Sequence, residues 1–206
     1  MIKNNVKNHI IPNSIDFCQK NILKNNRLFG LWIFLMSDCI MFAVLFSMYA
    51  VISENVYNAL ENEHFLNLFS VFLETFVLLL SSLSCGLIVV SMQKEKIKML
   101  VFYFLMTFFL GLVFLLVEIN EFCELIEKNY SPSQHALFSI FFALVGMHGM
   151  HIFFGLVLIL SILYQIKKLG LTDTIQIRIL CFSLFWHFLD IIWICIFTFV
   201  YLNRAI

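Results

Sequence analysis

Five long apolar runs divide this chain and constrain its fold more than any other feature. They cover residues 29–52, 65–92, 99–119, 135–164 and 177–201, approximately. Each run is long enough to cross a hydrocarbon core of about 30 Å as an α-helix, and none shows the alternation of apolar and polar residues typical of a membrane β-strand. The runs predict an all-α polytopic membrane protein, a single bundle of five transmembrane helices over residues 29–206 that follows a polar tail over residues 1–28.

The composition also indicates a membrane protein. Hydrophobic residues make up 62% of the sequence and charged residues 13%, with a mean hydropathy of +0.95. Soluble domains contain roughly 45–50% apolar residues. We therefore expect membrane lipids around the protein and no nucleic-acid partner.

The positions of the basic residues predict the orientation of the bundle. Most of them fall before the first run, between the second and third runs, or between the fourth and fifth runs. Lys and Arg gather on the cytoplasmic side of membrane proteins. The prediction is a cytoplasmic N-terminus and a periplasmic C-terminus. The cytoplasmic set is Lys3, Lys7, Lys20, Lys24, Arg27, Lys94, Lys96, Lys98, Lys167, Lys168 and Arg178, against Lys128 and Arg204 on the other side.

Few acidic residues lie inside the apolar runs. Asp38, Glu74 and Asp190 lie well within them, whereas Glu118 and Glu121 lie at the outer end of the third run. A central Asp costs about 2.5–3.5 kcal/mol on the insertion scale. Acids at this depth usually face the interior of a bundle, where they are paired or protonated.

Five titratable residues reach a similar depth on three helices. At 1.5 Å per residue, Asp38, His148, His151, His187 and Asp190 all fall near the middle of the membrane. The two histidines of the fourth run, and the His and Asp of the fifth, are spaced i,i+3 and so share a helix face. We expect one midplane cluster, in which at least one carboxylate lies within hydrogen-bond reach of a histidine on another helix.

Gly146 and Gly149 lie beside the two histidines of the fourth run. Small residues let membrane helices approach closely. They predict that a neighbouring helix packs tightly against this part of the fourth run.

Three functions fit such a cluster. Its members can form hydrogen bonds that fix helix packing, they can carry protons, or two histidines on facing helices can ligate the haem of a b-type cytochrome. The first is the expectation we favour. We assign no catalytic, cofactor-binding or metal-binding residue, and the sequence does not decide between packing and proton handling.

Four motifs together resemble subunit III of the haem–copper respiratory oxidases. They are GLWIFLMSDCIMF at 30–42, EINEF at 118–122, GMHGMHIFFG at 146–155 and FWHFLDIIWI at 185–194. The resemblance extends from Arg27 to the C-terminus. With ETFVLLLSS at 74–82 and Ser-Asp at 37–38, the chain looks most like the branch of the family found in bacterial cytochrome o ubiquinol oxidases.

The resemblance implies a non-catalytic subunit without cofactors of its own. It would sit in the bacterial inner membrane against subunit I, which carries the haems and copper, beside the other oxidase subunits. The complex would oxidise ubiquinol, reduce oxygen to water and pump protons, while this subunit supports assembly, stability and proton uptake. Asp38 would be the counterpart of the family's buried acid, with His148, His151, His187 and Asp190 carried over by motif. The alternatives are subunit III of a five-helix cytochrome c or menaquinol oxidase, or an independent proton-coupled transporter.

Overall fold

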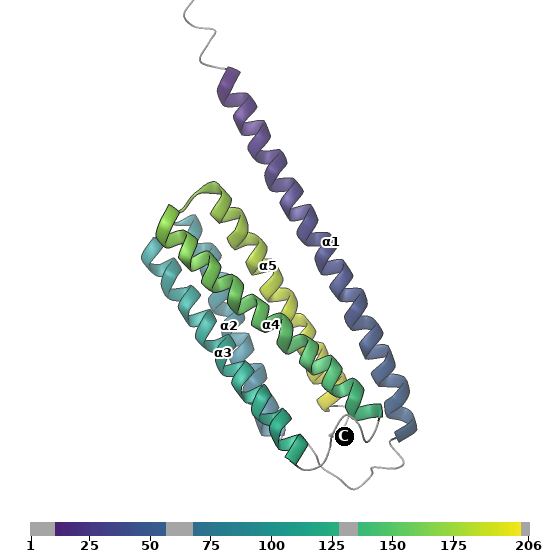
Figure 1. Cartoon of the computed structure of the whole chain (residues 1–206). Coiled ribbons are helices and arrows are strands. Elements are labelled where there is room, and N and C mark those ends of the chain that lie inside the picture. Colours follow the sequence, from purple (N-terminus) through teal and green to yellow (C-terminus); the bar gives the residue numbers. More distant parts are fainter. Residues whose placement is uncertain (1–10, 57–67, 128–135, 203–206) are drawn as a thin grey trace, which may run out of the picture.

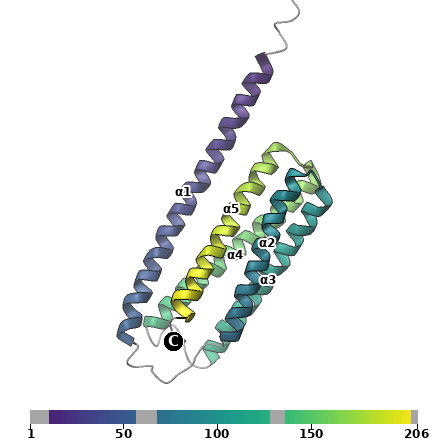
Figure 2. The same ribbon diagram turned by 180° about the vertical axis from the view of Figure 1, so that it is seen from behind.

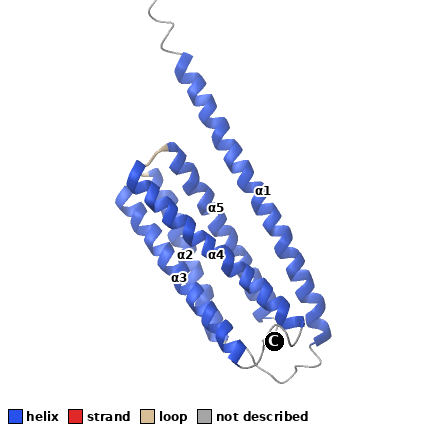
Figure 3. Cartoon of the chain, in the orientation of Figure 1, coloured by secondary structure: helices blue, strands red, loops and turns tan. Residues whose placement is uncertain are grey.

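The computed structural model describes residues 11–56, 68–127 and 136–202 and contains five long helices (Figures 1 and 3). All five are long and apolar enough to cross a membrane, so the prediction of a five-helix membrane protein is confirmed. A short π-helical segment, η2, continues the last helix. The elements are α1 (Ile11–Val56), α2 (Leu68–Gln93), α3 (Ile97–Glu127), α4 (Ala136–Leu169), α5 (Asp173–Ile196) and η2 (Phe197–Leu202).

The helices extend beyond the apolar runs. α1 begins at Ile11, well before residue 29, and α3 continues past residue 119 to Glu127. An α-helix satisfies its backbone hydrogen bonds within its own segment, so it can continue through polar sequence outside the hydrocarbon core. Residues 1–10 of the predicted tail and the start of the second predicted span lie outside the described residues.

Two tight turns connect helices at the end of the bundle where α1 begins. Between α2 and α3, Glu95 has a φ of 55° and its backbone N–H donates to the carbonyl oxygen of Met92 at 3.1 Å. After α4, Gly170 has a φ of 69° and donates to the carbonyl oxygen of Ile166 at 3.0 Å. Glycine adopts this left-handed conformation without strain, which explains the end of α4 at this residue.

Helices α2 to α5 form a compact bundle, and α1 packs on its outside. α2 and α3 lie side by side, and α5 lies between α2 and α4. α1 packs mainly against α4 and α5, and its N-terminal end extends beyond the end of the bundle (Figures 1 and 2). α1 is therefore the helix with the least support from the rest of the chain.

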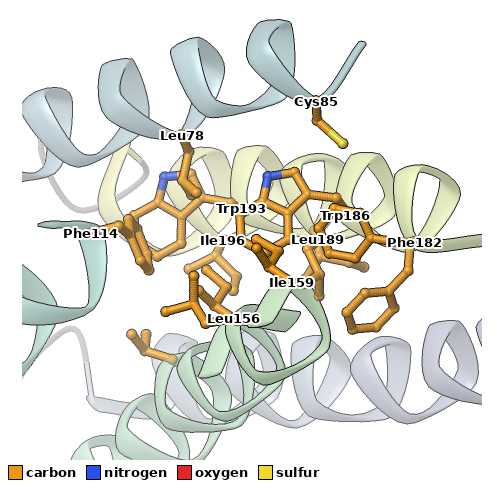
Figure 4. Packing of buried hydrophobic residues seen from close by; sticks show 14 of the residues in the cluster. Leu78, Cys85, Phe114, Leu156, Ile159, Phe182, Trp186, Leu189, Trp193 and Ile196 are labelled. Atoms are coloured by element: carbon orange, nitrogen blue, oxygen red, sulfur yellow. The ribbon is translucent and has the colours of Figure 1, made fainter. Parts of the chain in front are cut away.

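Two tryptophans of α5 occupy the centre of the core. Both indole nitrogens point towards α2 (Figure 4), where Trp186 Nε1 donates to Ser81 Oγ at 2.9 Å and Trp193 Nε1 donates to Thr75 Oγ1 at 3.1 Å. Both indoles are 1% exposed. A buried indole N–H needs an acceptor, so these two hydrogen bonds fix α5 against α2.

Glycines of two other helices make room for the Trp186 ring. A methyl group at Gly155 of α4 would lie 2.7 Å from Trp186 Cζ3, and one at Gly111 of α3 would lie 3.0 Å from Trp186 Cη2. The indole is thus held between α3 and α4 by backbone surfaces that have no side chain.

Candidate functional site

One carboxylate–histidine contact joins α1 to α4. His151 Nε2 lies 3.2 Å from Asp38 Oδ2, and both side chains are mostly buried, with 14% and 11% exposed. The interhelical contact that we expected between an acid and a histidine is present.

The other side of the His151 ring bonds to its own helix. His151 Nδ1 lies 2.7 Å from the carbonyl oxygen of Met147, which can only accept, so Nδ1 carries a hydrogen. The other ring nitrogen, Nε2, is the atom that lies 3.2 Å from Asp38 Oδ2, and this oxygen has no hydrogen-bond partner among the described residues. The pair Asp38–His151 is therefore a close polar contact between α1 and α4.

A second polar contact joins α5 to α2. His187 Nδ1 lies 2.8 Å from Ser82 Oγ and 3.9 Å from Asp190 Oδ2. The serine is within hydrogen-bond distance, whereas the aspartate is a longer-range neighbour. The Asp190 side chain is 8% exposed and that of His187 is 41% exposed, so the imidazole reaches the outer surface of the bundle.

His148 lies apart from both contacts, in the aromatic core. Its ring is fully buried, stacks on Trp193 with ring centroids 5.2 Å apart, and meets the edge of Phe114 at 5.9 Å. Neither ring nitrogen has a hydrogen-bond partner among the described residues. His148 acts here as a packed aromatic side chain.

The structure thus places the five midplane residues in two separate contacts and one isolated ring. Residues three apart on a helix are 60° apart around its axis, which is enough to direct His151 towards α1 and His148 into the core. Whether either contact handles protons stays a prediction.

The acids near the other end of the bundle are deeply buried. Glu74 of α2 is 1% exposed and Glu118 of α3 is 4% exposed, and their carboxylate oxygens have no hydrogen-bond partner in the described part of the chain. Glu118 and Glu121 are electrostatic neighbours of Glu74. These three acids, which the sequence placed inside a span or at its rim, are neighbours on α2 and α3, with Glu74 and Glu118 buried and Glu121 partly buried.

Glu118 is also the contact that makes Gly149 necessary. A methyl group at Gly149 would lie 2.6 Å from Glu118 Oε1, so α3 approaches α4 closely at this point. At Gly146 the nearest atom to such a methyl group is Phe122 Cε2 at 3.8 Å, an ordinary contact distance. The tight packing predicted for the two glycines is therefore found at Gly149 only.

The histidines of α4 and α5 have different neighbours. Trp193 covers one face of His148, and His187 Nδ1 is bonded to Ser82. Within residues 11–56, 68–127 and 136–202, no group of three or more His, Cys, Asp or Glu side chains could hold a metal ion.

The sequence analysis missed the hydrogen-bond partners on α2 and the glycines that make room for the Trp186 ring. Thr75, Ser81 and Ser82 lie on the side of α2 that meets α5, and each bonds a ring nitrogen of α5. Their spacing of six and seven residues corresponds to two helical turns and was the available signal. Gly111 and Gly155 gave no such signal, because their role depends on a tryptophan from another helix.

Comparison with known proteins gives a family and several full-length relatives. Residues 14–204 match the family described as cytochrome c oxidase subunit III. The chain is 66% identical over 187 residues to the cytochrome bo(3) ubiquinol oxidase subunit 3 of Buchnera aphidicola subsp. Schizaphis graminum, covering 91% of this chain and 99% of that protein. It is 61% identical to the protein of the same description from Buchnera aphidicola subsp. Acyrthosiphon pisum over the whole of both chains. The corresponding Pseudomonas aeruginosa protein is 44% identical over 88% of this chain and 87% of its own length.

Proposed function

Because this chain belongs to the cytochrome c oxidase subunit III family, we propose that it is the non-catalytic subunit III of a cytochrome bo(3)-type ubiquinol oxidase. The observation that carries the proposal is the end-to-end identity of 61% with a relative of that description. The complex oxidises ubiquinol, reduces oxygen to water and pumps protons. This chain supports its assembly, stability and proton uptake.

Subunit I of the complex is the main partner and holds the haems and copper. Most exposed side chains of the five helices are large and apolar, so the surface offers area for lipids and for other membrane subunits. Polar side chains of this chain join its helices through the Asp38–His151 contact and through hydrogen bonds at Ser82–His187 and Ser81–Trp186. Such contacts fix the packing of the bundle that the other subunits meet.

We assign proton handling by this chain to the Asp38–His151 pair, the carboxylate–histidine contact between α1 and α4. Packing explains the same contact, and we favour it, because it places two polar side chains beside one another rather than against lipid.

The inner membrane of a bacterium is the proposed location, with the N-terminus in the cytoplasm and the C-terminus in the periplasm. Lys94 and Lys96 in the turn after α2 form one basic group with Lys98 in the first turn of α3, and Lys167 and Lys168 in the last turn of α4 form another. Both lie at the end of the bundle where α1 begins, as the alternating directions of the helices require (Figure 1). This clustering of positive charge at one end supports a cytoplasmic side there.

Copurification tests the proposal directly. A C-terminal affinity tag on this chain, in membranes of its own host solubilised in mild detergent, should recover the other oxidase subunits, identified by mass spectrometry. The recovered complex should contain haem and copper and should oxidise ubiquinol in the presence of oxygen. It should oxidise reduced cytochrome c or menaquinol more slowly.

Two results count against the proposal. Recovery of the chain without any other oxidase subunit, under conditions in which subunit I stays soluble, would contradict the assignment as a subunit. A complex that prefers cytochrome c or menaquinol would keep the family and replace the ubiquinol assignment.

A further inference from the structure

A half-exposed histidine lies in the middle of the membrane-spanning part of α5. His187 is about 21 Å along the helix from Asp173 and about the same from Tyr201, at 1.5 Å per residue. Its side chain is 41% exposed on the surface of the chain. Ionisable side chains at this depth normally face a bundle interior, so the exposure requires an explanation.

Only one of the two ring nitrogens of His187 has a partner within the chain. Nδ1 is bonded to Ser82 Oγ, with Asp190 further away at 3.9 Å. No hydrogen bond to Nε2 is found among the described residues. Nε2 is a donor in one tautomer and an acceptor in the other, so it seeks a polar partner in either case. The acyl chains of lipids offer none.

The surface around His187 is suited to another helix. Leu184 and Ile191 flank His187 one turn away on either side along α5 and are exposed. On α2, Leu83 is exposed and Gly86 has no atom within 4 Å of the position of a methyl group. Ser82 and Gly86 are spaced i,i+4, the arrangement of small residues that permits close helix approach in membranes. We call this surface the α2–α5 face; it comprises Leu79, Leu83, Gly86, Leu184, His187 and Ile191.

The α2–α5 face is not covered by α1. α1 packs against α4 and α5, and in the view of Figure 2 α5 and α2 lie next to one another while α1 stands to the other side of α5. The Phe34 ring contacts Phe185, which lies on the side of α5 away from His187. A helix from another polypeptide therefore has access to the α2–α5 face.

We propose that the α2–α5 face binds a transmembrane helix of a neighbouring oxidase subunit, which presents a hydrogen-bonding side chain or a free backbone carbonyl to His187 Nε2. This inference rests on the proposed function, since it assigns the partner surface of the same subunit. A protein helix is the occupant because it can place a polar group at the membrane midplane, where lipid headgroups do not reach. Gly86 allows that helix to come close, and the flanking leucines and isoleucine pack against it.

A photo-crosslinking amino acid in the intact, solubilised oxidase tests the position of the face. It is placed at Ile191 in one variant and at Phe153 in the matched control, since both residues are exposed and mid-helical, and Phe153 belongs to the outer side of α4. Ile191 should crosslink to another oxidase subunit and Phe153 should crosslink to it much less. Crosslinks from Phe153 that equal or exceed those from Ile191 would overturn the proposal.

Two substitutions test the hydrogen bond itself. Replacement of His187 by Leu removes both nitrogens, whereas Ser82→Ala removes only the bond within the chain and leaves Nε2 available. After a detergent challenge, His187→Leu should increase the ratio of oxidase lacking this chain to intact oxidase about threefold over Ser82→Ala. That ratio corresponds to ~0.6 kcal/mol, the average for a hydrogen bond between membrane helices. Equal losses from both variants would show that His187 acts only within its own chain.

The failure of this inference is distinguishable from that of the proposed function. If the wild-type chain copurifies with the oxidase but Ile191 crosslinks to no subunit, the α2–α5 face is not the docking surface and the function stands. If no oxidase subunit copurifies with the wild-type chain, both proposals fail.

Discussion

Replacement of Gly155 by Ala should destabilise the bundle, although alanine is the better helix former. The new methyl group would lie 2.7 Å from Trp186 Cζ3 and 3.1 Å from Trp186 Cε3. Ordinary carbon–carbon contacts are about 3.5–4.0 Å. The clash therefore falls on a flat ring rather than on the end of a flexible side chain.

The ring has little freedom to retreat. On its other side it lies against Gly111, and its nitrogen is held by Ser81 at 2.9 Å. Overpacking a filled core costs about 1–3 kcal/mol, and a displacement this large belongs at the upper end of that range. The gain in helix propensity on replacing Gly by Ala is about 1 kcal/mol. The net destabilisation should be about 2 kcal/mol.

Thermal stability of the solubilised oxidase measures this effect. The temperature at which half of this chain is lost from the complex should fall by about 4–8 °C for Gly155→Ala, from about 2–4 °C per kcal/mol for a chain of this size. Gly30→Ala is the matched control, because no atom lies within 4 Å of a methyl group there. It should leave this temperature unchanged or raise it slightly.

A double-mutant cycle with Trp186→Phe identifies the cause. Phenylalanine lacks the second ring that the methyl group meets, so Gly155→Ala should cost much less in the Trp186→Phe background than in the wild type. An equal cost in both backgrounds, or a stability of Gly155→Ala no lower than that of Gly30→Ala, would refute the argument from the indole.

Three further predictions concern other parts of the chain. If the Asp38–His151 pair is structural, the Asp38→Asn variant should assemble and pump protons nearly normally. Asp38→Leu should lower the yield of assembled oxidase, because leaving the mostly buried His151 Nε2 without a polar neighbour costs about 1–3 kcal/mol of stability. An Asn variant with normal ubiquinol oxidation but impaired proton uptake would show that ionisation of Asp38 matters. The chain purified alone should bind no stoichiometric haem, copper or zinc by optical spectroscopy and metal analysis; one haem per chain that is lost on His187→Ala would contradict the subunit assignment. Glu95→Gly should raise thermal stability by about 1 kcal/mol, because Glu95 adopts a φ of 55°; a lower stability would mean that the Glu95 side chain makes a contact that outweighs its strained backbone.

Hydropathy was sufficient to find the five helices, because every backbone polar group that crosses lipid has to be satisfied within its own helix. Hydropathy could not locate the ends of the helices. α1 starts at Ile11 in sequence rich in Asn and Lys, and α3 runs on through four glutamates to Glu127. Outside the hydrocarbon core, water can hydrogen-bond polar side chains. The apolar content of the sequence therefore does not indicate where a helix ends there.

The candidate site was predictable in depth but not in direction. Residue counting placed Asp38 and His151 at one level, and the structure brings them into contact. It also placed His148 at that level, yet its ring packs on Trp193 in the core. The rotation of each helix about its own axis follows from the packing of large side chains, such as Trp186 into the gaps left by Gly111 and Gly155. A sequence pattern along one helix does not show such pairings between helices.

The position of α1 on the outside of the bundle also affects how the chain is made. α1 packs mainly against the last two long helices, and His151 is synthesised about 110 residues after Asp38. At ribosomal rates of roughly 5–20 residues per second, that interval lasts roughly 5–25 seconds. During it, the carboxyl group of Asp38 lacks the His151 imidazole that lies beside it in the folded chain. The first helix to enter the membrane is thus among the last to reach its packed position. Biogenesis of this subunit therefore requires α1 to stay inserted until α4 and α5 have been synthesised.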